Sequence, residues 1–529
     1  MTQRRSILKW TATACLWLCA APAAAQTADK TSSSRPNIVL IMADDLGFSD
    51  VGCYGGEIET PSIDRLANGG LRFTQFYNCA VCGTTRASLL TGLYPHQVGI
   101  HTWTGTINNR GVMFPELLRQ AGYQTMMVGK WDGAVPAVER GFERFFGFNT
   151  LGPGSYFKEV VSAPFYLDDQ PYTLPEDDFF MTDALTDYAV RFIEEATETD
   201  EPFFLYSAYI APHWPLHARE EEIAKYRDLY RKSGWDAIRR RRQQRQVELG
   251  IVDPEWTPQP RDPRVPAWDA AEHKDWQAER MAVYAAQVDR LDQNIGRTLD
   301  ALERAGVMHN TLILFLSDNG ASHQSGPDAA QLDNYADTGK PWRIDGTIMR
   351  AGNDPSVQPG VVGSFTSYGP EWAHVSATPM RGFKQDGYEG GINTPLIVHW
   401  PAVLRERGAV TDQVGHVFDL TATLIDVAGA EYPDDLPGLD LLPIEGKSLL
   451  PMLQRNERDG HDALYWELGG NRAVRQGKWK LVAQRGQPWE LYDIPADRPE
   501  TTDLAAEHPE RVKSMAALWQ AWAARVGAN

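Results

Sequence analysis

Residues 36–45 read PNIVLIMADD, an apolar run followed at once by two aspartates, and residues 311–319 read TLILFLSDN, which repeats this pattern. A continuous apolar run of this length, rich in branched residues, is typical of a strand buried on both faces of a parallel sheet. Apolar runs at 124–128, 203–209 and 395–400 have the same character, and most follow a helical pattern that ends at glycine. The alternation predicts an α/β fold with a large, mostly parallel sheet flanked by helices.

A helix with a regular apolar stripe precedes the second of these strands. Its apolar positions recur at helical spacing and are Tyr284, Val288, Leu291, Ile295, Leu299 and Leu302. Gly306 follows, and glycine commonly ends helices because it adopts left-handed backbone angles without strain. Shorter helices over 114–120 and around Leu185 to Phe192 lead in the same way into the strands at 124–128 and 203–209.

The chain from about residue 441 has a different pattern. Short strand-like segments lie at 465–467, 473–475, 479–482 and 489–494. A hairpin turn is expected at Gln476-Gly477. A closing helix is predicted by one apolar face, made of Val512, Met515, Trp519, Trp522 and Val526. We therefore expect a large domain over 35–440 and a C-terminal subdomain over 441–529, made of a small antiparallel sheet and a helix.

Two other segments stand out by composition. Glycine, proline and aspartate are frequent between residues 321 and 380, where periodicity is weak, so long loops are expected there. A basic run covers Arg239 to Arg242 and continues at Arg245. This run is either a face that binds polyanions or a solvated face of a helix, and the sequence leaves both interpretations open.

The N-terminal 25 residues have the layout of a signal peptide. Arg4, Arg5 and Lys9 precede an apolar stretch that is about half the length needed to span a bilayer, and Ala23 to Ala25 follow it. The paired arginines fit twin-arginine export, while general secretion is also open. We expect an exported protein, periplasmic or secreted, whose mature chain has no membrane span.

Charge and cysteine content narrow the function further. The formal net charge of −19 argues against nucleic acid as the main partner, because phosphate backbones bind basic surfaces. An anionic substrate would need a locally positive pocket. Beyond the signal segment the cysteines are Cys53, Cys79 and Cys82, too few for a disulfide framework. The sparse, odd set points to chemistry instead.

Polar residues stand just past the predicted strands, where ligands bind in open parallel sheets. They are Asp44, Asp45, Lys130, His213, Asp318 and Asn319. The three aspartates and the asparagine offer hard oxygen donors without a cysteine pair or a histidine cluster. This set suits Ca²⁺ or Mg²⁺ better than zinc.

The segment from Cys82 to Gly92 reads CGTTRASLLTG. Thr84 or Thr85 is expected to cap a helix that ends at Gly92, which places Cys82 at a helix N-terminus, where backbone N–H groups favour an anion. Arg86 adds a fixed positive charge one turn later. A disulfide between Cys79 and Cys82 is a plainer alternative, and a thioredoxin-like redox pair is disfavoured by the acidic pairs and the long chain.

These segments together resemble the formylglycine-dependent sulfatases, arylsulfatase-like members of the alkaline phosphatase superfamily. The similar blocks follow one another over nearly the whole mature chain, in the order RPNIVLIMADDLGFSDVGCYGG, CGTTRASLLTG, GYQTMMVGKWDG, APHWPLHA, FLSDNG, MRGFKQDGYEGGINTPLIVHWP, and finally NRAVRQGKWKLV with WELYDI. The resemblance implies an alkaline phosphatase-like fold, a sulfatase catalytic domain over 35–440, and hydrolysis of an aryl sulfate or a sulfated carbohydrate.

The resemblance also implies roles for single residues. Asp44, Asp45, Asp318 and Asn319 would hold Ca²⁺. Lys130 and Lys384 would bind the sulfate oxygens, His213 would protonate the departing alkoxide, and Arg86 would hold the nucleophile in place. The nucleophile would be formylglycine, made from Cys82 by a maturation enzyme. Its hydrate bears two hydroxyls on one carbon, so that one attacks sulfur and the other expels sulfate, whereas a plain thiol or hydroxyl would stay trapped as an ester.

Two positions in the expected site depart from the family pattern. Thr84 stands where proline or alanine is usual, within the signature that a maturation enzyme reads. Asp132 stands where a histidine usually contacts the nucleophile, and we expect it to act as a less basic substitute. Leu468 also replaces a frequent histidine. Other histidines that could compensate are His96, His101, His217 and His374.

Two other functions remain open at this point. A phosphate or phosphonate ester hydrolase of the same superfamily would use a hydroxyl nucleophile, here Thr84 or Thr85. A non-catalytic binder of sulfated glycans would explain the changes at Thr84 and Asp132.

Overall fold

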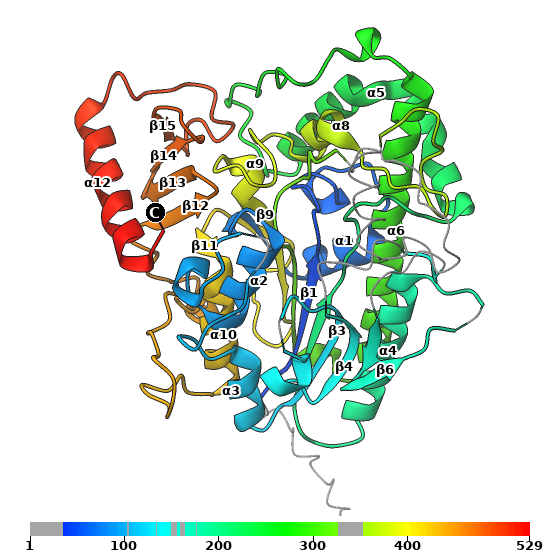
Figure 1. Cartoon of the computed structure of the whole chain (residues 1–529), viewed down its shortest axis with the longest axis vertical. Helices are drawn as coiled ribbons and strands as arrows, with labels where there is room; N and C mark the ends of the chain where they lie inside the picture. Colours follow the sequence, from blue (N-terminus) through cyan, green and yellow to red (C-terminus); the bar gives the residue numbers. More distant parts are fainter. Residues whose placement is uncertain are drawn as a thin grey trace, which may run out of the picture. The chain divides into compact units, whose positions relative to one another are not determined.

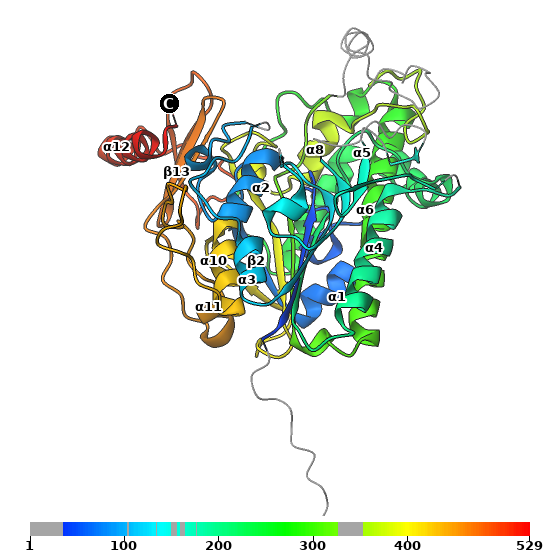
Figure 2. The same cartoon turned by 60° about the horizontal axis from the view of Figure 1, so that its bottom comes forward.

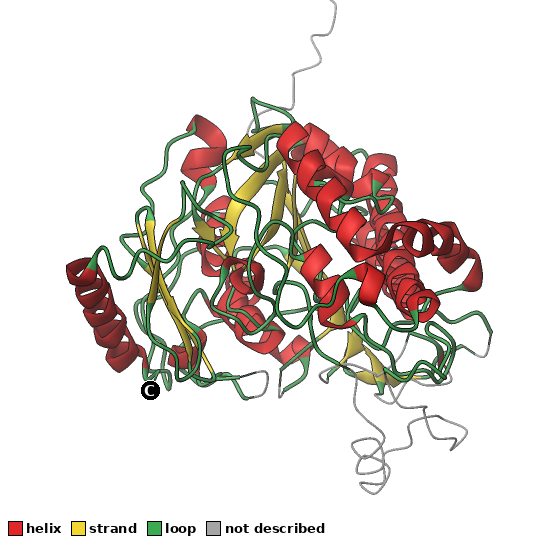
Figure 3. Cartoon of the chain, turned by 90° about the horizontal axis from the view of Figure 1, so that it is seen from above, coloured by secondary structure: helices red, strands yellow, loops and turns green. Residues whose placement is uncertain are grey.

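The computed structural model describes residues 35–528 except 103–104, 134, 150–155, 159–163, 176 and 326–352. The expected signal segment and the middle of the predicted 321–380 loops lie outside the described residues. The chain from Arg35 onward forms one compact unit. Two separate sheets are visible within it (Figure 3).

The larger sheet has the predicted, mostly parallel character. Its strand order in the described chain is β10-β2-β9-β8-β1-β7-β3-β4-β5-β6, and β11 also pairs with β2. The strands are β1 (Asn37–Ala43), β2 (Leu71–Tyr77), β3 (Gln124–Lys130), β4 (Arg144–Phe148), β5 (Phe165–Leu167), β6 (Gln170–Tyr172), β7 (Phe203–Ala208), β8 (Thr311–Ser317), β9 (Asn393–His399), β10 (Ala409–Thr411) and β11 (Gly415–His416).

Helices cover both faces of this sheet (Figures 1 and 2). On one face lie α1 (Pro61–Gly69), α4 (Met181–Ala196), α5 (Glu220–Glu248), α6 (Lys274–Arg304) and α8 (Gly369–Ser376). On the other lie α2 (Cys82–Thr91), α3 (Phe114–Gln120), α10 (Val417–Ala428) and α11 (Leu450–Arg455).

The central strand β1 shows how the sequence produces these two layers. Successive side chains of a strand point to opposite faces of the sheet. Val39 and Ile41 accordingly belong to the core on the α6 side, and Ile38, Leu40 and Met42 to the core on the α10 side. Both faces are buried, so every residue of the strand after Asn37 is apolar, as the sequence indicated.

Two strands differ from expectation. The segment 395–400 was grouped with the parallel strands, but β9 runs antiparallel to both β8 and β2. An apolar run reports burial and carries no information on strand direction. β2 was not predicted, because LRFTQFY mixes polar and apolar residues, although every side chain in it is buried.

The smaller sheet and its helix confirm the pattern read from the end of the chain. The strands pair in the order β12 (Leu464–Leu468), β13 (Asn471–Gln476), β14 (Trp479–Ala483) and β15 (Glu490–Asp493), all antiparallel, and α12 (Pro509–Val526) covers them. The hairpin turn lies at Gly477-Lys478, one residue later than expected. Leu449 and Leu453, however, pack into the core beside α10. The division of the chain at residue 440 stays a prediction.

No helix among the described residues is long and apolar enough to cross a membrane. The 321–380 segment contains α8 in addition to its loops.

A buried ionic network ties the small sheet to the large domain. Lys480 Nζ lies 2.9 Å from Glu389 Oε1 and 2.8 Å from Glu500 Oε1, and all three side chains are fully buried. Burial raises the pKa of Glu500 to about 7. Burial also opposes the ionisation of Glu389, but Lys480 and Arg498 lower the pKa of that carboxyl to about 2. Glu389 begins α9 (Glu389–Ile392), five residues after Lys384.

Lys480→Met tests this network. We expect a loss of about 3–5 kcal/mol in the free energy of unfolding, because two buried carboxylates lose their common partner. The matched control is Lys478→Met, whose half-exposed side chain pairs with Asp493 at the surface and is expected to cost about 1 kcal/mol or less. Urea denaturation measures both, and equal losses would contradict a structural role for Lys480.

Candidate active site at the carboxyl edge of the sheet

The register of β1 and β8 brings the two acidic pairs together. Ala43 pairs with Ser317 at the ends of these parallel strands, so Asp44 and Asp318 follow at the same level of the sheet. Asp45 has a φ of 67°, a left-handed angle that aspartate tolerates better than most residues. Its backbone N–H donates to Asp318 Oδ1 at 3.3 Å.

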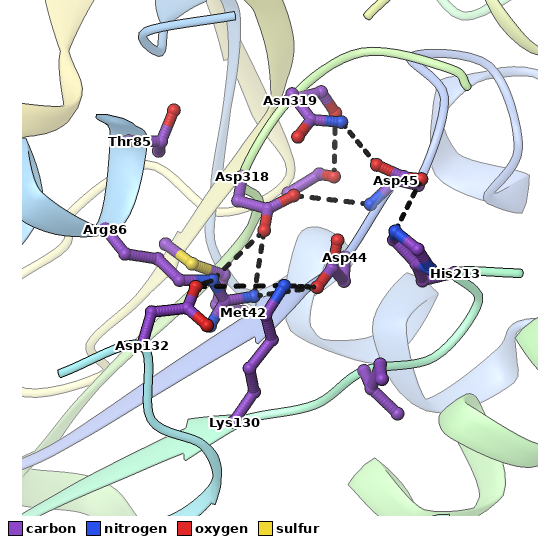
Figure 4. Close-up of polar contacts among 12 residues, drawn as sticks. Met42, Asp44, Asp45, Thr85, Arg86, Lys130, Asp132, His213, Asp318 and Asn319 are labelled. Carbon is purple, nitrogen blue, oxygen red and sulfur yellow. Dashed lines mark hydrogen bonds and ion pairs between the residues drawn. The ribbon is translucent and has the colours of Figure 1, made fainter. Parts of the chain in front are cut away.

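Asp44 lies in the middle of a buried group of charges (Figure 4). Its Oδ2 lies 2.7 Å from Lys130 Nζ and 3.3 Å from Arg86 Nη2, and the same Arg86 nitrogen lies 2.8 Å from Asp318 Oδ2. Burial opposes the ionisation of Asp44, but the surrounding cations hold its pKa well below the usual range. Lys130 and Arg86, which are distant in sequence, therefore meet at one carboxylate.

Asp45 organises the other side of the site. Its Oδ1 accepts hydrogen bonds from Lys384 Nζ at 2.5 Å and from Asn319 Nδ2 at 2.7 Å. Its Oδ2 lies 3.5 Å from His213 Nε2 (Figure 4). Burial lowers the pKa of His213, and the carboxylates of Asp45 and Asp44 act in the opposite direction.

Several oxygens in this group lack hydrogen-bond partners. Among the described residues, Asp44 Oδ1, Asp45 Oδ2 and Asn319 Oδ1 are buried and accept no hydrogen bond, although Asp45 Oδ2 has the 3.5 Å contact with His213. Burial and the neighbouring Asp44 raise the pKa of Asp318, which reports the mutual repulsion of these carboxylates. Unsatisfied buried oxygens are costly, and a hard divalent cation satisfies several at once. The donor set fits Ca²⁺. Asp44, Asp45 and His213 each offer one possible metal-ligand atom, and these three atoms lie within 4.8 Å of one another.

Cys82 lies at the first position of α2, as expected, and the helix ends at Gly92, whose φ is 72°. Its thiol is 5% exposed, and Lys130, Lys384, Asp44 and Asp132 are its electrostatic neighbours. Burial raises the pKa of this thiol to about 11, so the unmodified group is protonated near neutral pH and is a weak nucleophile. Cys79 and Cys82 are both free thiols, which contradicts the alternative of a disulfide between them.

The threonines after Cys82 do not cap the helix, which corrects that expectation. The N-cap residue is Val81. Thr84 Oγ1 donates to the carbonyls of Cys79 at 2.7 Å and Val81 at 2.9 Å, and Thr85 Oγ1 accepts from the Cys79 N–H at 2.9 Å. Both hydroxyls therefore fix the turn that leads into α2.

Asp132 follows the end of β3 and faces two cations. Its Oδ2 lies 3.7 Å from Arg86 Nε and 3.8 Å from Lys130 Nζ, and both carboxylate oxygens are buried without a hydrogen-bond partner in the described part of the chain. It also contributes to the electrostatic environment of Cys82. The side chain is therefore held by charge alone, and both oxygens are open to a donor.

The other histidines named from the sequence have contacts of their own. His96 Nε2 lies 2.7 Å from Glu467 Oε2, and its ring lies 5.1 Å from that of His101. His217 Nε2 lies 2.8 Å from the carbonyl of Ser364. His374 lies on α8 near Phe383, and Leu468 is buried in β12.

One contributor to the site was missed in the sequence. The Tyr206 hydroxyl accepts from Arg86 Nη1 at 3.3 Å and donates to the sulfur of Met42 at 3.3 Å. Tyr206 lies in the middle of β7 and not past its end, so the rule that identified the other residues does not reach it.

Comparison with known proteins identifies the family. The sulfatase family model matches residues 36–430, and a model of the C-terminal part of N-sulphoglucosamine sulphohydrolase matches residues 383–521. An uncharacterized sulfatase of Schizosaccharomyces pombe is 33% identical over 94% of this chain and 95% of its own. An arylsulfatase of Klebsiella aerogenes is 32% identical over 80% of this chain and 93% of its own.

Solved structures agree with this result. Ps i-CgsB, crystallised with k-i-k-neocarrahexaose, has a TM-score of 0.66 and 25% identity, over 92% of this chain and 93% of that one. A phosphonate monoester hydrolase of Agrobacterium radiobacter has a TM-score of 0.56 at 20% identity, over 93% and 96% of the two chains, which supports the alkaline phosphatase-like fold alone. The chain belongs to the sulfatase family, and its enzyme class is that of the sulfuric ester hydrolases.

Proposed function

We propose that this protein hydrolyses an aryl sulfate or a sulfated carbohydrate, with formylglycine made from Cys82 as nucleophile and with bound Ca²⁺. One observation carries the proposal: the buried Cys82 thiol has two lysines and two carboxylates from three separate segments as its electrostatic neighbours. Fixed cations around a nucleophile suit the attack on an anionic ester, because they offset charge that develops on the sulfate oxygens.

The metal ligands in this proposal are Asp44, Asp45, Asp318 and Asn319. The unpaired buried oxygens of Asp44, Asp45 and Asn319 support it. A bound Ca²⁺ would supply Lewis acidity toward a sulfate oxygen. His213 lies within ligand distance of the same group, but we assign it to proton transfer because the four oxygen residues already satisfy a hard cation.

Lys130 and Lys384 are the proposed sulfate-binding residues. Both ammonium groups are buried, Lys130 beside Asp44 and Lys384 beside Asp45. Arg86 contacts both Asp44 and Asp318, so its proposed role is to fix the nucleophile relative to the metal ligands.

Two residues are proposed to move protons. His213 donates a proton to the oxygen of the departing alcohol, which is a poor leaving group as an anion. Asp132 accepts a proton from the second hydroxyl of the formylglycine hydrate as the bond to sulfate breaks and the aldehyde reforms. Its two unpaired oxygens and its position among the neighbours of Cys82 support this role.

The alternatives have less support. A phosphate or phosphonate ester hydrolase would use Thr84 or Thr85, yet both hydroxyls are buried and engaged with backbone atoms of the preceding turn. A purely glycan-binding role would not require the buried charges around Cys82. We also propose that the segment 1–25 directs export, and that a formylglycine-generating enzyme oxidises Cys82 with dioxygen as oxidant.

The nucleophile is tested by the protein coexpressed with a formylglycine-generating enzyme. Peptide mass spectrometry is expected to find an aldehyde at residue 82, and Cys82→Ala is expected to lower turnover of an aryl sulfate by at least about 10³-fold. Cys53→Ala, which changes a buried cysteine on the 3-10 turn after β1, serves as the control with turnover close to wild type. Full activity with an unmodified Cys82 thiol would refute the proposed nucleophile.

The role of Asp132 is tested by two substitutions. Asp132→Asn removes the proton acceptor while keeping the shape, and turnover is expected to fall about 10²-fold with metal content unchanged. Asp132→His is expected to retain activity and to move the acidic limb of the pH–rate profile to higher pH, because imidazole is ordinarily more basic than a carboxylate. Full turnover of Asp132→Asn would show that another group is the base.

A further inference from the structure

The basic run on α5 is neither a continuous polyanion-binding face nor a uniformly solvated one. Arg242 is fully buried and pairs with Asp50 at 2.5 Å and Glu57 at 2.7 Å. Arg240 and Arg241 are exposed. Arg239 differs from all of these, because it is partly buried and two of its nitrogens have no partner among the described residues.

The guanidinium of Arg239 is incompletely paired among the described residues. Its Nε and Nη2 atoms are buried without hydrogen-bond partners, and no ion pair is found for it in the part of the chain that the structure describes. Burial lowers the pKa of Arg239 to about 10; Asp236 opposes this shift, and Arg261 adds to it. Buried charged groups are almost always paired, so an unpaired one indicates a ligand that supplies the missing charge.

Asp236, which lies near Arg239, and Asp262, which lies near His374, are already engaged by other residues. Asp236 Oδ1 lies 2.8 Å from Arg261 Nη2, and its Oδ2 accepts from the Trp268 N–H at 2.9 Å. Asp262 Oδ2 lies 2.8 Å from Arg264 Nη2. Each of these two carboxylates is therefore engaged by an arginine other than Arg239, and Arg264 also has Asp386 as an electrostatic neighbour.

His374 offers a second unsatisfied group at the same place. Its Nε2 is buried and has no hydrogen-bond partner within the described ranges of the chain. Burial and the nearby Arg239 lower its pKa to about 3, so the ring is neutral and contributes one N–H donor or one acceptor. Arg261 and Arg264, whose side chains are 43% and 47% exposed, connect this place with solvent. We call Arg239, Arg261 and His374 the Arg239 cluster.

The Arg239 cluster lies close to the proposed sulfate site. Helices α5 and α8 pack together (Figures 1 and 2), and the His374 ring of α8 lies 6.5 Å from that of Phe383. Arg264 lies over the same Phe383 ring at 4.7 Å. Phe383 directly precedes Lys384, whose ammonium contacts Asp45. His374 of the cluster therefore lies beside the residue that precedes Lys384, which is proposed to bind the reacting sulfate.

We propose that the Arg239 cluster binds an oxyanion, and that this oxyanion is a second sulfate or carboxylate group of the substrate. The guanidinium presents paired donors that match a sulfate or carboxylate, with His374 as an additional donor. The identity of the ligand as a substrate group rests on the proposed function. It makes the preferred substrate a carbohydrate with more than one acidic group, in place of a simple aryl sulfate.

Calorimetric titration with sodium sulfate at constant ionic strength tests binding by itself. Wild-type protein is expected to show two binding events, and Arg239→Gln to lose one of them or weaken it at least about tenfold. Arg240→Gln is the matched control, since it removes the same charge from an exposed neighbour, and it is expected to keep both events. The binding event that remains in Arg239→Gln reports the site at Lys384. Loss of that event alone would count against the proposed function, and an unchanged pair of events in Arg239→Gln would count against the Arg239 cluster.

Thermal unfolding without added anion excludes a merely structural role. Arg239→Gln is expected to raise Tm relative to wild type, because a buried charge without a partner is removed, and to respond less to sulfate. A lower Tm together with unchanged sulfate binding would overturn the cluster as an anion site.

Kinetics then identify the source of the oxyanion. With two saccharide substrates that differ only in a second sulfate, Arg239→Gln is expected to raise KM for the disulfated one about tenfold, with kcat nearly constant, and to leave KM for the monosulfated one unchanged. If sulfate binding is lost but both KM values stay the same, the ligand is free sulfate, and the assignment to a substrate group is wrong.

Discussion

The constraint on which this structure depends is the burial of several carboxylates at one edge of a sheet. Asp44, Asp45 and Asp318 are all buried at the ends of β1 and β8, where water cannot offset their repulsion. The groups that meet them include Arg86, Lys130 and Lys384, together with a fourth carboxylate, Asp132. The four carboxylates and the three cationic side chains leave one excess negative charge, and a bound divalent cation would change the sign of this charge. The site then carries a net positive charge, which suits a sulfate ester.

The rest of the molecule holds this group together. The register of β1 with β8 sets the two acidic pairs at one level, and α2 places Cys82 and Arg86 beside them. The small C-terminal sheet supports the turn before Cys82, because Trp466 Nε1 donates to the carbonyl of Asn78 at 2.7 Å. The backbone N–H of Gln385 donates to the carbonyl of Ala80 at 2.8 Å, which joins the Lys384 turn to the same segment. The two sheets therefore meet at the nucleophile.

Sequence patterns predicted much of this because the determinants are local. Uninterrupted apolar runs identified β1, β3, β7 and β8, and polar residues past their ends identified Asp44, Lys130, His213 and Asp318. Lys384 follows no predicted strand and was found only by resemblance. Tyr206 and β2 were missed because a side chain in the middle of a strand, or a strand of mixed polarity, has no signature until its neighbours are known. The direction of β9 depends on its partners for the same reason.

The basic run on α5 shows a further limit of sequence patterns. Four consecutive arginines look alike in the sequence, yet the helix gives them different surroundings. Arg242 is neutralised by Asp50 and Glu57, and Arg240 and Arg241 are exposed. Arg239 is partly buried, and two of its nitrogens have no partner among the described residues. Whether an arginine has a structural or a ligand-binding role therefore depends on the charges that surround it in the folded chain, and not on the number of charges in the sequence.

The central claim is that the unpaired oxygens of Asp44, Asp45 and Asn319 exist to hold a cation. Elemental analysis of the purified protein, followed by unfolding before and after treatment with a calcium chelator, tests it most directly. The account predicts one calcium ion per chain and a marked loss of stability on its removal, restored by added Ca²⁺. Protein that is equally stable and active without metal, or that carries stoichiometric zinc and no calcium, would contradict it.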